Sequence, residues 1–327
     1  MNIIKSIEYY FIKHSLIKHY NTIVIGLSGG PDSVFLLHVL KSLQEKYNLT
    51  LIAAHLNHEW RPEADTEEGL CRILAQKLHI PFVSAKLSSL LSITKKYRGS
   101  KEEYARNMRR HFLEQVLREH NAHSIALGHH AQDQQETFFI RLIRGTSLAG
   151  LTCMQPRHGL YIRPLLETNK ADILQWLKEH NIAYAIDLSN ESDNYLRNRI
   201  RKSVIPALIE CDERWNNNFL TTINRLKEDD ALLNDIATST LSTLIIKKDN
   251  EEVFDIKKFS VVHSSLYHRI IMLWLIRNNL QFSVTQAFLD EIIRFLLHER
   301  GGKHAIHEEW VLVKKQGLVR IEKIRKD

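Results

Sequence analysis

Residues 23–33 read Ile-Val-Ile-Gly-Leu-Ser-Gly-Gly-Pro-Asp-Ser, and this stretch decides the fold of the first half of the chain. Its β-branched start predicts a buried strand, and the amphipathic segment 34–47 predicts a helix whose first position is Pro31. Gly29 and Gly30 join the two, so backbone N–H groups can approach a ligand without a Cβ in the way. Because a helix N-terminus carries free N–H groups and a positive dipole, this turn is suited to bind an anion.

The side chains of the turn indicate a phosphate-binding site. Ser28 and Ser33 offer hydroxyl donors, and the carboxylate of Asp32 is suited to hold Mg²⁺ beside phosphates. The spacing and lysine of a Walker loop are absent, and no third glycine completes a dinucleotide fingerprint. A glycine-rich turn without a ligand is the alternative that these residues alone leave open.

Size and composition indicate a globular protein with room for two domains, since the 327 residues are 44% hydrophobic and 25% charged. No apolar run approaches the length of a membrane span, and no signal-peptide layout is visible, so we expect no membrane association. Cys71, Cys153 and Cys211 are isolated, which predicts a reducing cytoplasm and argues against disulfides or a Cys-ligated metal. The net charge of +7 favours a polyanionic partner such as nucleic acid.

Strand-like and helix-like patterns alternate through the first part of the chain. Strands are expected at 49–55, 81–87, 122–128 and 160–166, and helices at 64–78, 101–120, 133–144 and 170–180. This alternation predicts an α/β domain with a parallel sheet covered on both faces. In such folds ligands bind at the carboxyl ends of the strands.

The pattern changes near Trp215. Helices are expected at 219–241, 264–278 and 285–298, and the runs 310–313 and 318–321 predict a terminal hairpin. We therefore expect a first domain over 1–214 and a smaller, mainly helical α+β domain over 215–327.

Four further motifs carry candidate functional residues. In Gly-His-His-Ala-Gln-Asp-Gln-Gln-Glu-Thr (128–137), Asp133 and Glu136 share one face of a first helical turn. Such acidic side chains often serve only the helix dipole, but two carboxylates at this sheet edge are also suited to hold an amine. The pairs His55/His58 and His129/His130 invite a zinc hypothesis, yet no H-E-x-x-H or cysteine partner completes a site. We favour the interpretation that these histidines are polar groups that line a nucleotide pocket.

Two arginine-rich segments complete the set. Arg106 and Arg109 lie on one face of the helix predicted at 101–120. They are either solvated surface charges, or their guanidinium groups reach the α-phosphate or a nucleic-acid substrate. The run Arg197-Asn198-Arg199 follows the segment Asp187-Leu-Ser-Asn190 and suits contacts with RNA phosphates or packing between domains.

Together these motifs resemble those of the tRNA(Ile)-lysidine synthetases, a family of the PP-loop ATP pyrophosphatase superfamily. The resemblance is dense over residues 21–206. It rests, in order, on S-G-G-P-D-S, H-L-N-H, G-S-x-E-E-x-A-R-x-x-R, G-H-H-A-x-D-x-x-E-T, G-L-x-x-M, R-P-L-L, D-x-S-N and R-N-R-I-R. The C-terminal third matches only in size and in its basic hairpin.

The resemblance implies an N-terminal PP-loop domain and an ATP-dependent ligase that attaches free L-lysine to the wobble cytidine of an isoleucine tRNA with a CAU anticodon. O2 of the cytosine would be adenylated with release of pyrophosphate, and the lysine ε-amine would then attack C2 and expel AMP. ATP and Mg²⁺ are the implied cofactors. The oligomeric state, including a homodimer, stays open.

The resemblance also implies roles for individual residues. ATP is held by Ser28, Gly29, Gly30, Pro31, Asp32 and Ser33, with Asp32 on the magnesium ion. Asp32 and Arg109 are catalytic, and Asp133 with Glu136 recognises lysine. Arg106 would lie beside Arg109 and contact the tRNA, and Arg144, Arg197, Asn198 and Arg199 would support the tRNA or the local fold. Lys314 and Lys315 are expected to contact tRNA because of their place in the basic hairpin, the alternative being ordinary solvated charges.

The chain departs from the family pattern at Gln132, at Glu59-Trp60 and at Arg110. Three alternatives use the same loop. A tRNA thiolase would need catalytic cysteines or an iron–sulfur cluster, and a small-molecule amide or NAD synthetase would need no basic appendage. An RNA-binding module that only senses ATP would need no acidic pair.

Overall fold

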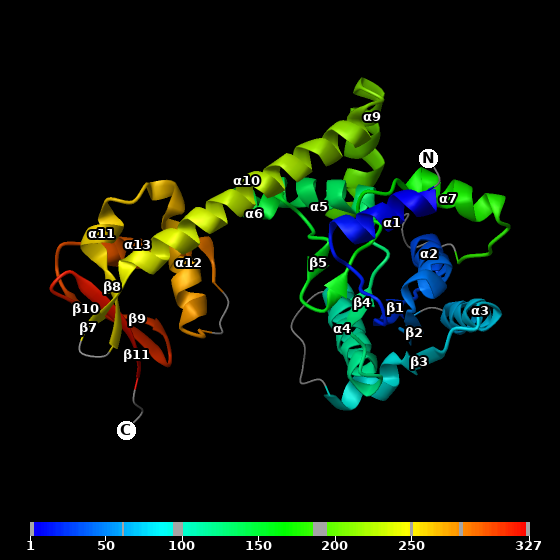
Figure 1. Cartoon of the computed structure of the whole chain (residues 1–327), viewed down its shortest axis with the longest axis horizontal. Coiled ribbons are helices and arrows are strands. Elements are labelled where there is room, and N and C mark those ends of the chain that lie inside the picture. The colour runs from blue at the N-terminus through cyan, green and yellow to red at the C-terminus, as the bar shows by residue number, and fades with distance from the viewer. Residues whose placement is uncertain are drawn as a thin grey trace. The chain divides into compact units, whose positions relative to one another are not determined.

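The computed structural model describes residues 3–60, 62–93, 101–185, 195–248, 251–280 and 284–324. It divides the chain into two compact units, Met1–Asn224 and Arg225–Asp327 (Figure 1). The division lies inside helix α10 (Trp215–Leu244), later than the change of pattern at Trp215 predicts. The reason is that Trp215 and Phe219 pack their rings against Phe139 and Phe138 of the first unit, so the start of α10 belongs to that unit.

The first unit is built on a six-stranded sheet in the order β3-β2-β1-β4-β6-β5. The strands are β1 (Thr22–Gly26), β2 (Thr50–Asn57), β3 (Phe82–Lys86), β4 (Ser124–Ala126), β5 (Arg157–His158) and β6 (Tyr161–Ile162). All neighbours are parallel except β5, which pairs antiparallel with β6 at one edge. The predicted α/β class and parallel sheet are confirmed. Of the strand expected at 160–166, only β6 forms.

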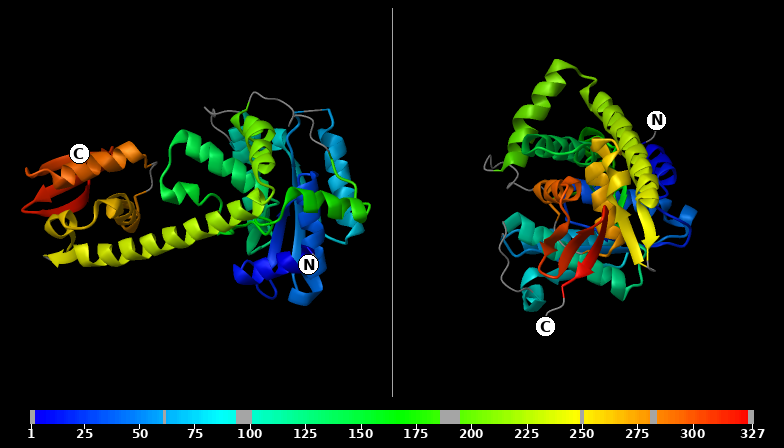
Figure 2. Two further views of the ribbon diagram at one scale, coloured as in Figure 1. Left: turned by 90° about the horizontal axis from the view of Figure 1, so that it is seen from above. Right: turned by 90° about the vertical axis from the view of Figure 1, so that its left-hand side faces the viewer.

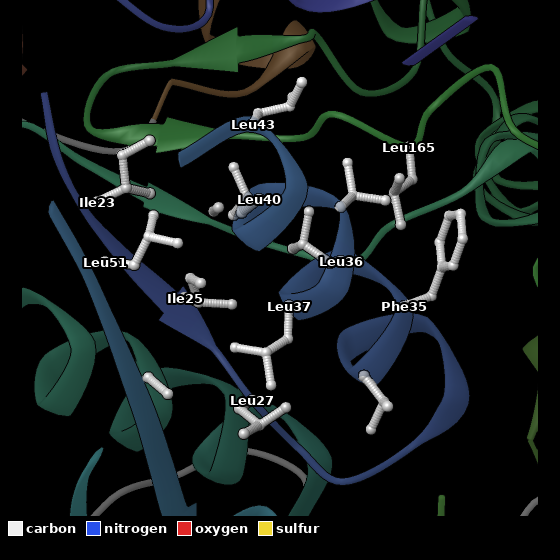
Figure 3. Packing of buried hydrophobic residues seen from close by; sticks show 14 of the residues in the cluster. Ile23, Ile25, Leu27, Phe35, Leu36, Leu37, Leu40, Leu43, Leu51 and Leu165 are labelled. Carbon is white, nitrogen blue, oxygen red and sulfur yellow. The ribbon is translucent and has the colours of Figure 1, made fainter. Parts of the chain in front are cut away.

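Helices cover both faces of this sheet, and side-chain alternation in the strands decides which residues face them. Ile23 and Ile25 of β1 pack in one buried cluster with residues of α1, α2 and α7. Figure 3 shows these two isoleucines facing Leu36, Leu37 and Leu40 of α2. Val24, between them, belongs to a second cluster formed with α4 on the other face.

Five helices of the first unit match those expected from the sequence, at 34–47, 64–78, 101–120, 133–144 and 170–180, and its other helical elements were not predicted. The full set is α1 (Ile3–Lys13), α2 (Pro31–Tyr47), α3 (Ala64–Lys77), the 3-10 helix η1 (Leu87–Ile93), α4 (Lys101–Glu119), α5 (Ala131–Arg144), α6 (Leu148–Leu151), α7 (Lys170–Glu179), α8 (Leu196–Arg199), the π-helical turn η3 (Ile200–Val204) and α9 (Ile205–Cys211). The order β1–α2 reproduces the predicted strand, glycine turn and proline-started helix.

The second unit combines helices with an antiparallel sheet in the order β7-β8-β11-β10-β9. Its elements are the remainder of α10, then β7 (Ile245–Lys248), β8 (Glu251–Asp255), α11 (Ile256–Ser260), the 3-10 helix η4 (Ser264–Leu266), α12 (Tyr267–Arg277), α13 (Gln286–Leu297), β9 (Gly302–His307), β10 (Trp310–Lys315) and β11 (Leu318–Lys323). The predicted hairpin is β10–β11, where Lys315 pairs with Leu318.

The core of the second unit forms between its helices and the inner face of its sheet. Trp274 of α12, Ile292 of α13, and Leu312 and Val319 of the hairpin lie in one buried cluster. Figure 2 shows α13, in orange, beside the red strands of the hairpin. No helix of the described part of the chain is long and apolar enough to cross a membrane.

Candidate functional site

The loop 28–33 between β1 and α2 is closed by its own hydrogen bonds. Ser33 Oγ accepts from the backbone N–H of Ser28 at 3.1 Å and donates to the carbonyl of Gly30 at 2.9 Å. Gly29 has φ +86°, and a Cβ there would lie 3.3 Å from Cys71 Sγ, so both backbone and space favour glycine. The loop is therefore preorganised, with the N-terminus of α2 beside it.

A second glycine brings the end of β4 against the start of α2. A Cβ on Gly128 would lie only 2.9–3.1 Å from backbone atoms of Asp32 and Ser33. These contacts are with backbone, which cannot swing away, so a side chain at residue 128 would displace the loop. The G-H-H motif and the loop 28–33 are thus adjacent.

Asp32 lies at the start of α2 with a partly exposed carboxylate. Its Oδ1 accepts a hydrogen bond from Lys170 Nζ at the first residue of α7. Its Oδ2 lies 3.6 Å from His130 Nε2, beyond hydrogen-bond distance. The sequence did not single out Lys170; the only signal was its position just after the R-P-L-L motif.

This donor set fits a magnesium ion shared with phosphates. Magnesium in proteins is commonly bound by one or two carboxylates and completed by phosphate oxygens and water. Oδ2 of Asp32 is such an oxygen, because His130 Nε2 lies beyond hydrogen-bond distance from it and the hydrogen bond from Lys170 goes to Oδ1. Within the described ranges, no group of three or more His, Cys, Asp or Glu side chains has the arrangement of a metal site, and the histidine pairs form none.

The acidic pair on α5 is occupied by arginines. Asp133 Oδ1 lies 2.8 Å from Arg197 Nη2, while Glu136 lies 2.5 Å from both Arg197 Nε and Arg201 Nε. Glu136 is fully buried, whereas the Asp133 side chain keeps 13% exposure. Burial opposes ionisation of Asp133, but nearby His130, His129 and Arg197 outweigh it and lower its pKa. The picture of two carboxylates facing an open cleft is therefore corrected for Glu136.

The histidines are polar groups that lie near the loop 28–33 and the acidic pair. His130 Nε2 lies 3.5 Å from Asp133 Oδ2 and 3.6 Å from Asp32 Oδ2, so it connects the acidic pair with the loop. Burial lowers the pKa of His129 to about 4. Burial also lowers the pKa of His55, whose Nδ1 lies 2.9 Å from the Leu27 carbonyl just before the loop.

Some arginines of the predicted site are exposed, and others contact named side chains. Arg109 Nη2 lies 3.4 Å from His58 Nε2, which joins α4 to the end of β2. Arg106, Arg144 and Arg199 are exposed. Arg197 pairs with both carboxylates of α5, and Asn198 is buried, which favours the alternative that these two residues support the local fold. The segment Asp187–Asn190 lies outside the described residues.

Lys314 also has a different role from the one its position in a basic hairpin predicts. Its side chain is buried, and Nζ donates to the carbonyls of Phe295, Leu296 and His298, the Leu296 bond being 2.7 Å long. A cation at the C-terminus of a helix is favoured by the helix dipole and satisfies carbonyls that lack partners. Lys314 therefore caps α13, and burial lowers its pKa. Lys315 is exposed.

The parallel sheet, the Ser-Gly-Gly loop and the aspartate at the start of the following helix define an α/β protein of the PP-loop class. The chain belongs to the PP-loop domain family, whose model matches residues 3–208. A solved structure of a U34-tRNA thiolase from Methanococcus maripaludis has the same fold, with a TM-score of 0.58 at 18% identity over 69% of this chain and 78% of that one.

The curated relatives confirm the resemblance seen in the motifs. The chain is similar to the tRNA(Ile)-lysidine synthases of Geobacillus kaustophilus, at 31% identity over 91% of this chain and 65% of that protein, and of Bacillus cereus, at 30% over 89% and 63%. It is also 34% identical to the bifunctional protein TilS/HprT of Listeria innocua, over 83% of this chain and 42% of that protein. The chain thus spans less than two thirds of the length of these relatives.

Proposed function

We propose that this protein is an ATP-dependent ligase that joins free lysine to C2 of the wobble cytidine of an isoleucine tRNA with a CAU anticodon. The observation that carries the proposal is the position of His130, within 3.6 Å of Asp32 at the loop and 3.5 Å of Asp133 on α5. The aspartate that we assign to the phosphate site and the carboxylate that we assign to the amine therefore lie on either side of one histidine. The names of the relatives supply the substrate class.

The first step needs ATP held with its α-phosphate exposed. The loop 28–33 and the N-terminus of α2 would hold the pyrophosphate end of ATP through backbone N–H groups and the hydroxyls of Ser28 and Ser33. Asp32 would hold a magnesium ion, which neutralises phosphate charge when bound. Lys170 adds a cation at the same place. O2 of the cytosine attacks the α-phosphorus, and the bond to pyrophosphate breaks.

The second step needs the lysine ε-amine beside the activated base. Asp133 would bind the ammonium group, because its carboxylate keeps some exposure while Glu136 is buried beneath two arginines. Glu136 contributes to the lysine pocket through Arg197, which it holds against Asp133. After losing a proton, the amine attacks C2, the C2–O2 bond breaks, and AMP leaves. Arg109 would stabilise the reacting phosphate.

Contacts with tRNA would come from exposed basic side chains. In the first unit we assign this role to Arg106, Arg144 and Arg199, and in the second to Lys315. We propose the second unit, together with the end of α10 that enters it, as the tRNA-binding part. The salt dependence of binding tests this assignment.

A tRNA thiolase is the main alternative, because a thiolase has the same fold. The cysteines do not favour it. Burial raises the pKa of the Cys71 thiol to about 12, Cys153 is buried, and Cys211 alone of the three is exposed. A thiol that is never ionised at neutral pH is a poor sulfur carrier.

The proposal is tested by nucleoside analysis. The full chain is incubated with ATP, Mg²⁺, labelled lysine and an isoleucine tRNA transcript bearing CAU, and the digested tRNA is analysed by mass spectrometry. We expect lysine on the wobble cytidine, and none when the anticodon is changed to GAU. Pyrophosphate release that needs no tRNA would indicate a small-molecule synthetase, and sulfur in the tRNA would indicate a thiolase.

A further inference from the structure

A polar cavity lies beside the first residues of β1 and β4, at the other end of these strands from the loop 28–33. It has a volume of about 400 Å³ and is lined by Ser15, Lys18, Asn21, His123, Ser124 and Arg157. Ser124 is the first residue of β4, and His123 contacts Thr22, the first residue of β1. Because the loop follows the last residue of β1, the length of this five-residue strand separates the two places, about 17 Å.

The lining of this cavity is basic. Lys18 is exposed, and its Nζ makes no ion pair or hydrogen bond with any described residue. Arg157 Nη2 donates to the carbonyl of Leu16 at 2.6 Å, which holds the guanidinium at the rim and leaves its other N–H groups available. No lining residue is a carboxylate. The charge of the cavity therefore favours an anion.

His123 adds a hydrogen-bond donor, and one hydrogen bond determines which ring nitrogen donates. The backbone N–H of Thr22 donates to His123 Nδ1 at 3.0 Å, so Nδ1 carries no proton. In the neutral ring the proton is then on Nε2, which makes Nε2 a hydrogen-bond donor.

Ser124 supplies the observation that points to a ligand. Its side chain is only 2% exposed, yet Oγ has no hydrogen-bond partner in the described structure. Leaving a buried hydroxyl unpaired is costly, so such a group in a folded protein calls for an explanation. Ser124 belongs to the lining of the basic cavity, so a ligand that enters it deeply enough could accept a hydrogen bond from this hydroxyl.

We propose that this cavity binds the phosphate group of a nucleotide. Lysine, arginine, serine and an imidazole N–H together match the acceptor oxygens of a phosphate. The volume is in the range of pockets that hold whole small molecules, about 300–1,000 Å³, so it can hold more than an inorganic ion. The nucleotide can be free or part of an RNA strand. This inference does not depend on the proposed ligase function.

The test follows His123 directly, so that phosphate bound at the loop 28–33 does not interfere. The full chain is labelled with ¹³C-histidine, and the His123 resonance is identified by its loss in His123→Gln. Inorganic phosphate, AMP and a short single-stranded RNA are titrated separately. We expect a saturable shift of the His123 resonance with phosphate and a tighter one with AMP. A still tighter response to RNA identifies an RNA phosphate as the ligand, and no response to RNA identifies the free nucleotide.

Three variants keep the proposal falsifiable. Lys18→Gln should weaken binding at His123 about fivefold, because one exposed charge contact is lost. Lys13→Gln, an exposed lysine on α1 outside the cavity, should leave it unchanged. Ser124→Ala removes a hydroxyl that bonds nothing in the described protein, so the fold should be at least as stable while binding weakens. No saturable shift with any probe, or equal affinity in Lys18→Gln and the unmodified protein, overturns the proposal.

Discussion

The guanidinium of Arg197 lies between the two carboxylates of α5, with Nη2 2.8 Å from Asp133 Oδ1 and Nε 2.5 Å from Glu136 Oε2. Together with Arg201, which pairs with the other oxygen of Glu136, it balances the charge of the acidic pair before any substrate arrives. Asp133 keeps a second oxygen, which accepts from the His130 backbone N–H at 2.9 Å. The two carboxylates are thus not equivalent, and replacing them should have different effects.

Replacing Asp133 by Asn should chiefly affect lysine. A charge-assisted bond to an ammonium contributes roughly 1.5–3 kcal/mol, so KM for lysine should rise about tenfold or more while KM for ATP changes little. Pyrophosphate release at varied lysine and ATP measures both. Equal changes in the two constants would mean that Asp133 serves the nucleotide instead.

Glu136→Gln should instead destabilise the first unit. It removes the buried carboxylate that pairs with both Arg197 and Arg201. Because the two arginine side chains are 39% and 41% exposed, solvent screening keeps the cost below that of a fully buried pair, at about 1.5–3 kcal/mol. A lowered melting temperature with little change in KM for lysine is expected. A variant that is as stable as the unmodified protein would show that Glu136 is not a structural partner of these arginines.

Asp32→Ala should abolish ATP turnover while the fold persists, because the side chain is partly exposed and fills no core. Loss of a metal-holding carboxylate removes several kcal/mol of transition-state stabilisation. Asp172→Ala is the matched control, since Asp172 also lies in the first turn of a helix and is exposed. Normal pyrophosphate release from folded Asp32→Ala would rule out the assignment of the loop.

Gly128→Ala tests whether the contact between β4 and α2 positions the loop. The added Cβ would meet the backbone of Asp32 and Ser33 at 2.9–3.1 Å, so the loop must shift and ATP affinity should fall at least tenfold. Gly69→Ala in α3 is the control, because its Cβ would meet nothing within 4 Å. There we expect unchanged ATP binding and a stability gain of about 0.5–1 kcal/mol. Isothermal titration with ATP measures the difference, and equal affinity in both variants would contradict the role of Gly128.

The local pattern of the chain was enough to predict the sheet and the loop. The run from Ile23 to Ser33 holds the strand, the turn and the helix start within one segment, and each is a short-range preference. The strand expected at 160–166 failed because Pro164 interrupts the run and β6 ends at Ile162.

Pairings across long distances in sequence were not predictable. Lys170 meets Asp32 across 138 residues, and Arg201 meets Glu136 across 65. A local sequence pattern does not distinguish an arginine that pairs with a buried carboxylate from an arginine that binds RNA. Lys314 shows the same limit, since only the packing of the hairpin on α13 reveals that its ammonium is enclosed.

The shifted pKa of His129 predicts a loss of stability in mild acid. The pKa is about 4 in the folded protein and near 6.5 when exposed, so the unfolded chain binds more protons between these values. Stability should therefore fall as pH drops from 6.5 towards 4. Between pH 7 and 5 this one group contributes a loss of about 2 kcal/mol.

The comparison with His129→Gln isolates this contribution. Urea titrations at pH 7 and pH 5, with hydrogen exchange of peptides from β1 and α2 reporting on the first unit, should show a smaller loss in the variant. The same pH dependence in both proteins would mean that His129 is protonated as readily in the folded state as in the unfolded state.

The outer face of the C-terminal hairpin is the place where we expect the second unit to contact tRNA. Lys303 pairs with Val313 across β9 and β10, and residues 313 and 315 share a face, so Lys303 and Lys315 lie on one exposed side while Lys314 points into the core. Neutralising Lys303 and Lys315 together should weaken tRNA binding and reduce the slope of log K against log salt by about two, roughly one for each lost phosphate contact.

Lys314→Met should leave that slope unchanged and lower the stability of the second unit, because three carbonyls of and after α13 lose their cap. Filter binding over a salt series measures the slopes, and an unchanged slope in the double variant would move tRNA recognition to the exposed arginines of the first unit.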